Sequence, residues 1–404
     1  MNARIIAAQC PELGPSAAVQ QAIQGVSETV VSELKLDHLK RNVSRQRMVS
    51  RIKNPLPPDS KQIDFEIPDG FLQYVDGSSF ILYDSWTDPQ FLLSGFESGE
   101  DRVTLMGRQE ALYNLQTSTE WAIDDRLTKR PRFFPLFWAV YAPSGAYFRP
   151  QVFVLGTQKS QKIYRFVLNK LRSLIGVCNL SRLFIPHDRE LMDAFVSVFG
   201  SQLQFYGCFL HMWQHFYNQI VNLNLNVQYG TDLEFALIAR YLPCLAFLPD
   251  YKVHEGFGVI SNYARAKFDA LMDSLLGWFQ TRYLGVLGHV GGPMQCQPEV
   301  AIPFWTLNQR MPDDLQRLSV AIEAFQRHIH KQIKTDDNIW HTLGGLHESS
   351  AAWSEPSDAL PSTNIAQFQR LVNLAADKQR QLALGELAML GFFKDLATKL
   401  DIFN

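Results

Sequence analysis

The sequence predicts a mixed α/β fold, in which helices cover a mixed β-sheet. Between residues 119 and 220, short runs of β-branched and aromatic residues alternate with stretches of helical periodicity. Hydrophobic residues make up 46% of the chain and aromatic residues 12%, which is enough for a large core. The five cysteines are widely scattered without a paired C-x-x-C, so we expect reduced thiols and no zinc ribbon.

The predicted elements between residues 119 and 220 follow one order. Three strands are expected first, at 121–124, 133–141 and 151–155. A helix follows from Ser160 to Ile175, because its apolar residues recur with helical spacing. The remaining expected elements are a strand at 183–185, a helix at 188–199, a strand at 203–206 and a helix from about 209. This βββαβαβα order is the ribonuclease H-like order.

Composition and turn signals divide the rest of the chain. The run Asn54 to Pro58 is rich in proline and marks a linker. We therefore expect a basic helical region and linker at 1–58, a small α/β prelude at 59–117, the first part of the core at 118–224, an all-helical insertion at 225–312, a core helix at 313–340, and a linker and helix at 341–404.

Charge limits how the chain could bind nucleic acid. The 38 Lys and Arg residues face 40 Asp and Glu residues, a net charge of −2, whereas proteins that depend on phosphate contacts are usually basic. Local patches must therefore carry any DNA binding. One candidate is the basic run from Lys35 to Lys53, which includes Arg41, Arg45 and Arg47. The alternative is a solvated helix face.

The sequence predicts no membrane segment. The longest apolar stretches, such as Phe133 to Ala142, are far below the roughly 20 residues that span a bilayer. The apolar run near the start, Ile5 to Ala8, is too brief for a signal peptide. An intracellular protein is therefore expected.

Two carboxylates occupy strand ends in this predicted core. Asp124 closes the first strand, and Asp188 follows the fourth strand. Because adjacent strands lie about 4.8 Å apart, carboxylates at their ends can share metal ions, with a third ligand from a later helix. The alternative is that each Asp is a turn residue or a helix N-cap.

Several blocks resemble those of Mutator-like transposases. Trp121 to Asp124, followed by Pro131, Phe134, Phe137 and Trp138, resemble the family's "W-x-x-D-G-T-F-K…P…F". The later blocks that resemble family motifs are Lys159, Ser160 and Tyr164; Asp188 to Leu191; Gly207 to His211 with Gln214; Leu245 to Pro249; and Ala321 to Arg327. The likeness covers roughly residues 30 to 335.

The resemblance implies a DDE-type DNA transposase, which cuts transposon ends and transfers strands in the nucleus. Asp124, Asp188 and Glu323 would be the catalytic carboxylates that hold two Mg²⁺ or Mn²⁺ ions, about 3.5–4 Å apart. DNA is the implied partner, and a homo-oligomer is compatible with it. The alternative is a domesticated or decayed copy that binds DNA or protein without cutting.

The departures from the family pattern bear on this choice. After Asp124, Asp125 and Arg126 stand where the family has Gly and Thr, and Gln326 stands where it has His. Asp188 aligns only with a gap of about two residues before Ala194; without the gap, Pro186 takes the ligand position. The gapped alignment is favoured because four consecutive residues match.

Two further groups of residues are candidates for binding a ligand. Cys208 and His211 could bind Zn²⁺ with His215, but no fourth ligand is evident, so we expect the pair to pack in the core without metal. Lys129, Arg130 and Arg132 follow Asp124 closely and are the best-placed basic residues for contacts with DNA phosphates. The alternative for these three is a solvated loop.

Overall fold

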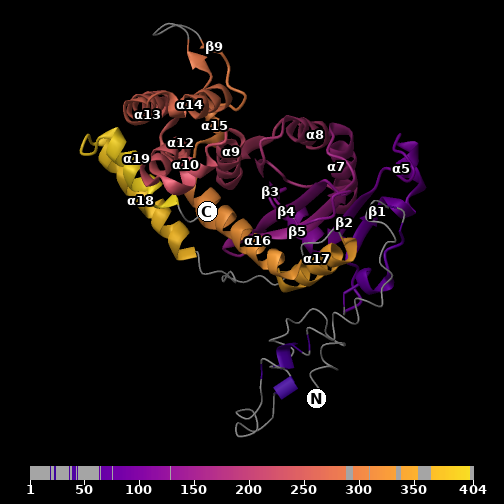
Figure 1. The fold of residues 1–404 in the computed structure, drawn as a ribbon. Coiled ribbons are helices and arrows are strands. Elements are labelled where there is room, and N and C mark those ends of the chain that lie inside the picture. The colour runs from indigo at the N-terminus through magenta and orange to yellow at the C-terminus, as the bar shows by residue number, and fades with distance from the viewer. Residues whose placement is uncertain are drawn as a thin grey trace. The chain divides into compact units, whose positions relative to one another are not determined.

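The computed structural model describes two compact units of the chain (Figure 1). Unit 1 comprises Met1–Ser181, Glu190–Gln202 and Phe325–Asp358, and unit 2 comprises Arg182–Arg189, Leu203–Ala324 and Ala359–Asn404. The described residues are 63, 65–74, 76–127, 129–287, 294–308, 310–333, 338–353 and 365–400, with 19, 22, 23, 36, 39–41 and 43. None of the described helices is both long enough and apolar enough to cross a membrane.

The strands confirm a mixed α/β class with a seven-stranded mixed sheet, in the order β1-β2-β5-β4-β3-β6-β7. Within unit 1 the pairings β1–β2, β2–β5, β5–β4 and β4–β3 are all antiparallel, and within unit 2 β6 pairs with β7 in parallel. The strands are β1 Ile81–Asp84, β2 Val103–Gly107, β3 Glu120–Asp124, β4 Leu136–Ser144, β5 Tyr147–Gly156, β6 Arg182–Ile185 and β7 Gln204–Gly207.

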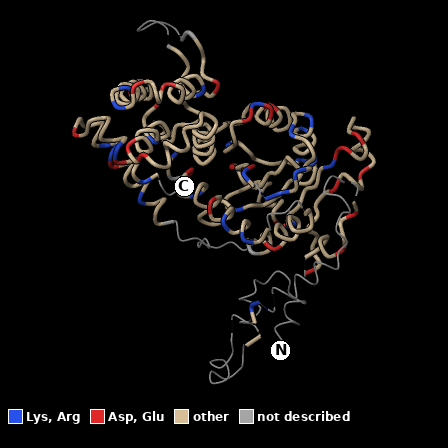
Figure 2. Tube along the Cα trace, in the orientation of Figure 1, with Lys and Arg blue, Asp and Glu red and all other residues tan. Residues whose placement is uncertain are grey.

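Helices lie on both sides of the strands of unit 1: Figure 1 shows α7 on one side and α17 on the other. The helical elements here are η1 Asp69–Phe71, η2 Ser85–Thr87, α5 Pro89–Leu93, α6 Gln109–Thr117, α7 Gln161–Ile175, α8 Arg189–Phe199 and α17 Ile339–Trp353, with the later part of α16 Val320–Gln332. Acidic and basic residues are interspersed along the described part of the chain in Figure 2.

Helix α7 shows how the sequence determines these elements. The Ser160 side chain accepts a hydrogen bond from the Ile163 amide at 3.4 Å and so caps the helix. The residues predicted to face the core, such as Tyr164 and Val167, are buried. Tyr164 packs on Trp138 of β4, with ring centroids 5.1 Å apart. The expected βββαβαβα order, from β3 to α9, is confirmed to within a few residues at each boundary.

The two strands of the expected prelude extend the sheet of unit 1. β2 pairs with β5, with Leu105 opposite Val154, and β1 pairs with β2. The partner of β2 lies about 50 residues further along the chain, and β1 joins the sheet through β2. Local patterns do not encode pairing over that distance, so the sequence did not reveal that these strands belong to the same sheet.

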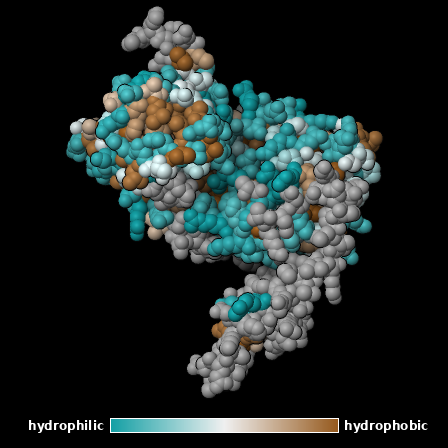
Figure 3. Space-filling model, in the orientation of Figure 1, coloured by the Kyte–Doolittle hydropathy of each residue, from teal (hydrophilic) through white to brown (hydrophobic). Residues whose placement is uncertain are grey.

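Unit 2 is mainly helical. Its helices are α9 Phe209–Asn222, α10 Asn226–Thr231, α11 Leu233–Ala239, α12 Tyr241–Cys244, η3 Leu245–Phe247, η4 Asp250–Lys252, α13 Val253–Phe268, η5 Asp269–Met272, α14 Asp273–Phe279, η6 Gln280–Leu284, α15 Ile302–Trp305, η7 Pro312–Ser319, the start of α16, α18 Ile365–Ala383 and α19 Met389–Ala397. Figure 3 shows hydrophobic residues gathered on the face of this unit around α12.

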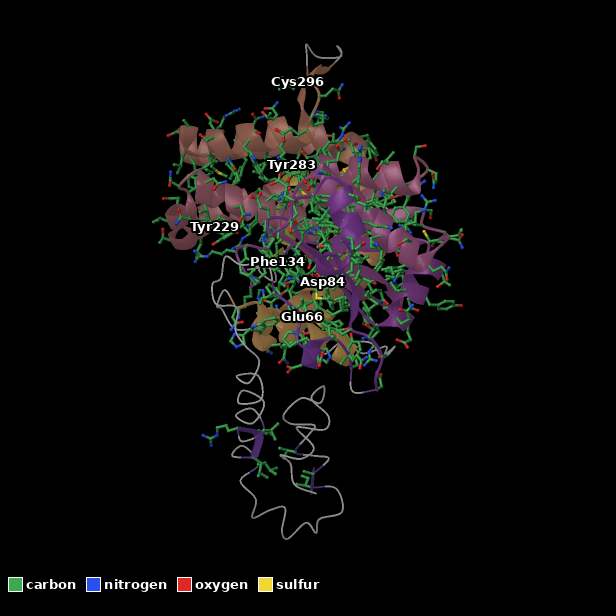
Figure 4. The ribbon with its side chains drawn as sticks, turned by 90° about the vertical axis from the view of Figure 1, so that its right-hand side faces the viewer. Glu66, Asp84, Phe134, Tyr229, Tyr283 and Cys296 are labelled. Atoms are coloured by element: carbon green, nitrogen blue, oxygen red, sulfur yellow. The ribbon has the colours of Figure 1, made fainter. Side chains whose placement is uncertain are left out.

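The expectation of an all-helical insertion is wrong at one place, where β8 Val286–Leu287 pairs with β9 Met294–Cys296. The hairpin carries Cys296, labelled in Figure 4. Gly285 ends the preceding π-helix with a φ of 73°, and a Cβ there would lie 2.4 Å from the Cys296 carbonyl oxygen. Strands of two and three residues are too short to give a recognisable alternating pattern.

A buried ion pair fixes one edge of the sheet. Arg102 and Asp84, the latter labelled in Figure 4, meet at 2.6 Å from Nη2 to Oδ2 and 3.0 Å from Nε to Oδ1. The Arg102 side chain is only 1% exposed, and its Nη1 also donates to the carbonyl oxygens of Ile63 and Phe65. One guanidinium therefore joins β1 and β2 to the segment that precedes them.

Replacing Arg102 with Met should destabilise the protein strongly, because Asp84 would remain as an uncompensated buried charge. We expect the free energy of unfolding to fall by about 3–5 kcal/mol in urea denaturation. Arg265→Ala is the control: Arg265 and its partner Asp273 are 57% and 45% exposed, so its effect should stay within about 1 kcal/mol. Equal losses in the two variants would contradict the importance of burial.

Candidate carboxylate site

Asp124 is the last residue of β3, and the structure buries it completely, with 0% of its surface exposed. β3 pairs with β4, which places Asp124 opposite Ala139. The three residues before it, Trp121, Ala122 and Ile123, are also buried. Side chains on both faces of this strand are therefore inside the protein, which explains why the run is almost continuously apolar until the carboxylate.

Arg126 and Gln326, both in unit 1, bind the Asp124 carboxylate. Arg126 donates from Nε to Oδ1 at 2.8 Å, and its backbone amide donates to the same oxygen at 3.3 Å. Gln326, in α16, donates from Nε2 to Oδ2 at 2.6 Å. The Arg126 side chain is 13% exposed and Gln326 is 8% exposed. We call these three residues, Asp124, Arg126 and Gln326, the Asp124 clasp.

The Asp124 carboxylate does not fit a metal ligand in this arrangement. Mg²⁺ binds carboxylate oxygens at about 2.0–2.1 Å and usually keeps several waters. Here a guanidinium nitrogen lies 2.8 Å from one oxygen, an amide nitrogen lies 2.6 Å from the other, and the residue has no exposed surface. The positive charge that a metal would supply is already supplied by Arg126.

In the loop that follows Asp124, the side chains of Lys129 and Arg130 donate hydrogen bonds to main-chain carbonyl oxygens of this chain. Lys129 donates from Nζ to the carbonyl oxygens of His330 and Ile333, at 2.7 and 3.3 Å, and so caps the carboxyl end of α16. Arg130 donates to the carbonyl oxygens of Leu127, Phe134 and Pro135, and burial lowers its pKa. Both head groups therefore have a structural use.

The other basic candidates differ in their exposure. Arg132 is exposed on the same loop, and Arg41 is exposed within the part of the amino-terminal region that the structure describes. Arg45 and Arg47 lie outside the described residues. Of the three loop residues predicted to contact phosphate, Arg132 is the one with an exposed side chain.

Asp188 lies in unit 2, where it directly precedes α8 and is half-buried. Its amide donates to the Pro186 carbonyl oxygen at 2.8 Å, which forms a tight turn after β6. In the neighbouring His187, Nδ1 lies 3.3 Å from Nη2 of Arg282. Burial, and next the charge of Arg282, lower the pKa of His187 to about 4, so its imidazole is neutral at pH 7.

Glu323 lies in the first turn of α16, in the part of this helix that belongs to unit 2, and is half-buried. Of the three predicted carboxylates, unit 1 thus contains Asp124, and unit 2 contains Asp188 and Glu323. Among the described residues, no three His, Cys, Asp or Glu side chains form a group that could hold a metal ion.

Sequence reasoning did not identify the partners of Asp124, although a signal was present. Arg126 and Gln326 both depart from the pattern of Mutator-like transposases, which has Thr and His at these positions. The structure brings these two departures together on one carboxylate. They are 200 residues apart in sequence, so their common partner could be found only from the fold.

Cys208 and His211 line a small, mainly apolar cavity in unit 2, together with His215, Tyr283 and Phe304. Cys208 is 2% exposed and His211 3% exposed, and the His211 amide donates to the Cys208 carbonyl oxygen at 3.1 Å. Gly207, which precedes them, lies against Phe304: a Cβ at this position would come within 2.5 Å of the phenyl ring.

We expect purified protein to contain no stoichiometric zinc, as measured by elemental analysis, and a chelator to leave its melting temperature unchanged. Cys208→Ala should cost about 1 kcal/mol of stability, since it removes a small buried apolar group. Cys178→Ala, at a half-buried cysteine, is the control and should cost less. Zinc that is present in the wild type and lost from the Cys208 variant would reverse this assignment.

The comparison with known proteins adds no family assignment, because the chain matches no protein-family model and no curated protein. The likeness to Mutator-like transposases therefore rests on the sequence blocks quoted above.

Proposed function

We propose that this chain derives from a Mutator-like transposase, has a ribonuclease H-like core and binds DNA. The observation that supports the proposal is the order of elements from β3 to α9, with Asp124 as the last residue of β3 and Asp188 directly before α8. Carboxylates at strand ends and helix starts are typical of sites that act on phosphodiesters with divalent metal. A protein with this function would act in the nucleus.

Two functions are compatible with this origin, and the geometry favours one of them. Binding without cutting is favoured because the first carboxylate is occupied by Arg126 and Gln326. Metal-dependent cleavage and strand transfer is the second candidate, since Asp188 directly precedes α8, Glu323 lies in the first turn of α16, and both are half-buried. In that case Mg²⁺ or Mn²⁺ would supply the Lewis acid and activate the attacking oxygen.

A nicking assay distinguishes the two functions. The purified full chain is incubated with supercoiled plasmid and with end-labelled duplex DNA, in Mg²⁺ and separately in Mn²⁺. We expect the protein to retard the labelled DNA while the plasmid stays supercoiled. Open-circle product that disappears in Asp188→Asn would establish the cleavage function instead. If the chain retards no DNA at low salt, the proposed DNA-binding function is refuted.

Arg132 should contribute to DNA binding, whereas Lys129 and Arg130 should act mainly on stability. Arg132→Ala is expected to weaken binding and to reduce the slope of log K against log salt by about one, the value for one lost phosphate contact. The matched control is Lys129→Ala with Arg130→Ala: because both head groups bind main-chain carbonyls, this pair should lower the melting temperature and leave the slope unchanged. A slope altered only in the control would contradict the assignment.

A further inference from the structure

We infer that Asp124 acts in this chain as an internal anchor and not as a metal ligand, with Arg126 in the place of the cation. The Asp124 clasp then fastens the loop after β3 to helix α16, through the bond from Gln326 to Oδ2. The inference rests on the proposed function, because a metal at Asp124 is expected only from a transposase origin. Its geometry, however, comes from unit 1 alone.

The burial of Asp124 requires electrostatic compensation. A carboxylate with no exposed surface is stable as an anion only when a cation and hydrogen bonds compensate for its lost hydration. Arg126 supplies the charge at 2.8 Å, and Gln326 satisfies the second oxygen at 2.6 Å. Oδ1 already accepts from the Arg126 Nε and from the Arg126 backbone amide, so both of its lone pairs are used, and a divalent cation on this oxygen would have to displace one of these donors.

The residue types of the two partners, Arg126 and Gln326, favour the same role. Arg126 has a forked guanidinium and is always charged, so it suits a buried carboxylate better than the Thr of the family pattern. The side-chain nitrogen of Gln326 only donates hydrogen bonds, whereas a neutral His has a basic nitrogen that can bind a metal. Both departures therefore favour an Asp124 carboxylate whose charge and hydrogen bonds are compensated by the protein itself.

A second contact supports the anchoring role. Lys129, three residues after Arg126, binds the carbonyl oxygens of His330 and Ile333. The end of β3 and the loop after it thus contact α16 twice, at Gln326 and again at the carboxyl end of the helix, one to two helical turns later. Side chains that a nucleic-acid enzyme could direct at phosphates are used here to hold a helix.

The test uses Mn²⁺ as the probe and compares the full wild-type chain with Asp124→Asn/Arg126→Gln, which removes both charges and keeps similar shapes. Electron paramagnetic resonance counts the ions bound per chain as Mn²⁺ is added, in the absence of DNA. The control, Asp125→Asn/Arg132→Gln, removes the same two charges from the same loop. We expect all three proteins to bind the same number of ions with the same affinity. One ion that is lost only in the Asp124/Arg126 variant would overturn the inference.

A double-mutant cycle gives a second readout that does not involve metal. Asp124→Asn and Arg126→Gln should each lower the ratio of folded to unfolded protein by roughly 100-fold or more, because each removes one charge of a buried ion pair and leaves the other charge in place. The double variant should lose much less than the product of the two single losses. Multiplicative losses would show that the pair is not coupled and would overturn the inference. Failure of DNA binding would refute the proposed function but leave both of these results intact.

Discussion

The balance of one buried charge, that of Asp124, governs the arrangement around the end of β3. A strand buried on both faces delivers this carboxylate to a place without solvent, so the neighbouring chain must compensate for it. Arg126 and Gln326 do so, and the loop that holds Arg126 is in turn held by Lys129 and Arg130. The path of the loop and the position of the later part of α16 therefore follow from the same electrostatic requirement.

The same solution recurs elsewhere in the part of the chain that the structure describes. Its other buried carboxylates are Asp84 and Asp314, and each is paired with an arginine. Asp314 is bound by Arg310 at 2.8 Å and by the Ser319 hydroxyl at 2.8 Å, while burial raises its pKa. Arginines that are paired with buried carboxylates cannot also bind DNA phosphates. In a chain with a net charge of −2, this leaves fewer basic side chains for DNA binding.

The sequence predicted the fold from β3 to α9 well, because these elements carry strong local signals. Alternating or continuous apolar runs mark the strands, and Ser160 and the apolar stripe after it mark α7. Contacts between distant segments could not be predicted in this way. The pairing of β2 with β5 and the bond between Gln326 and Asp124 both depend on tertiary structure, and the short hairpin β8–β9 has too few residues to show a period. The contact between Gln326 and Asp124 is one of those that distinguish an ion pair from a metal centre at this site, and the sequence alone does not show it.

The close approach of Gly207 and Phe304 has a consequence for how this protein can change over evolutionary time. A methyl group at position 207 would overlap the phenyl ring at 2.5 Å, so even the smallest substitution there requires a smaller residue at 304. The two positions should covary among descendants of this chain, although 97 residues separate them. Because Phe304 also packs edge-on against His187, such an exchange would remove one of the apolar contacts of this imidazole.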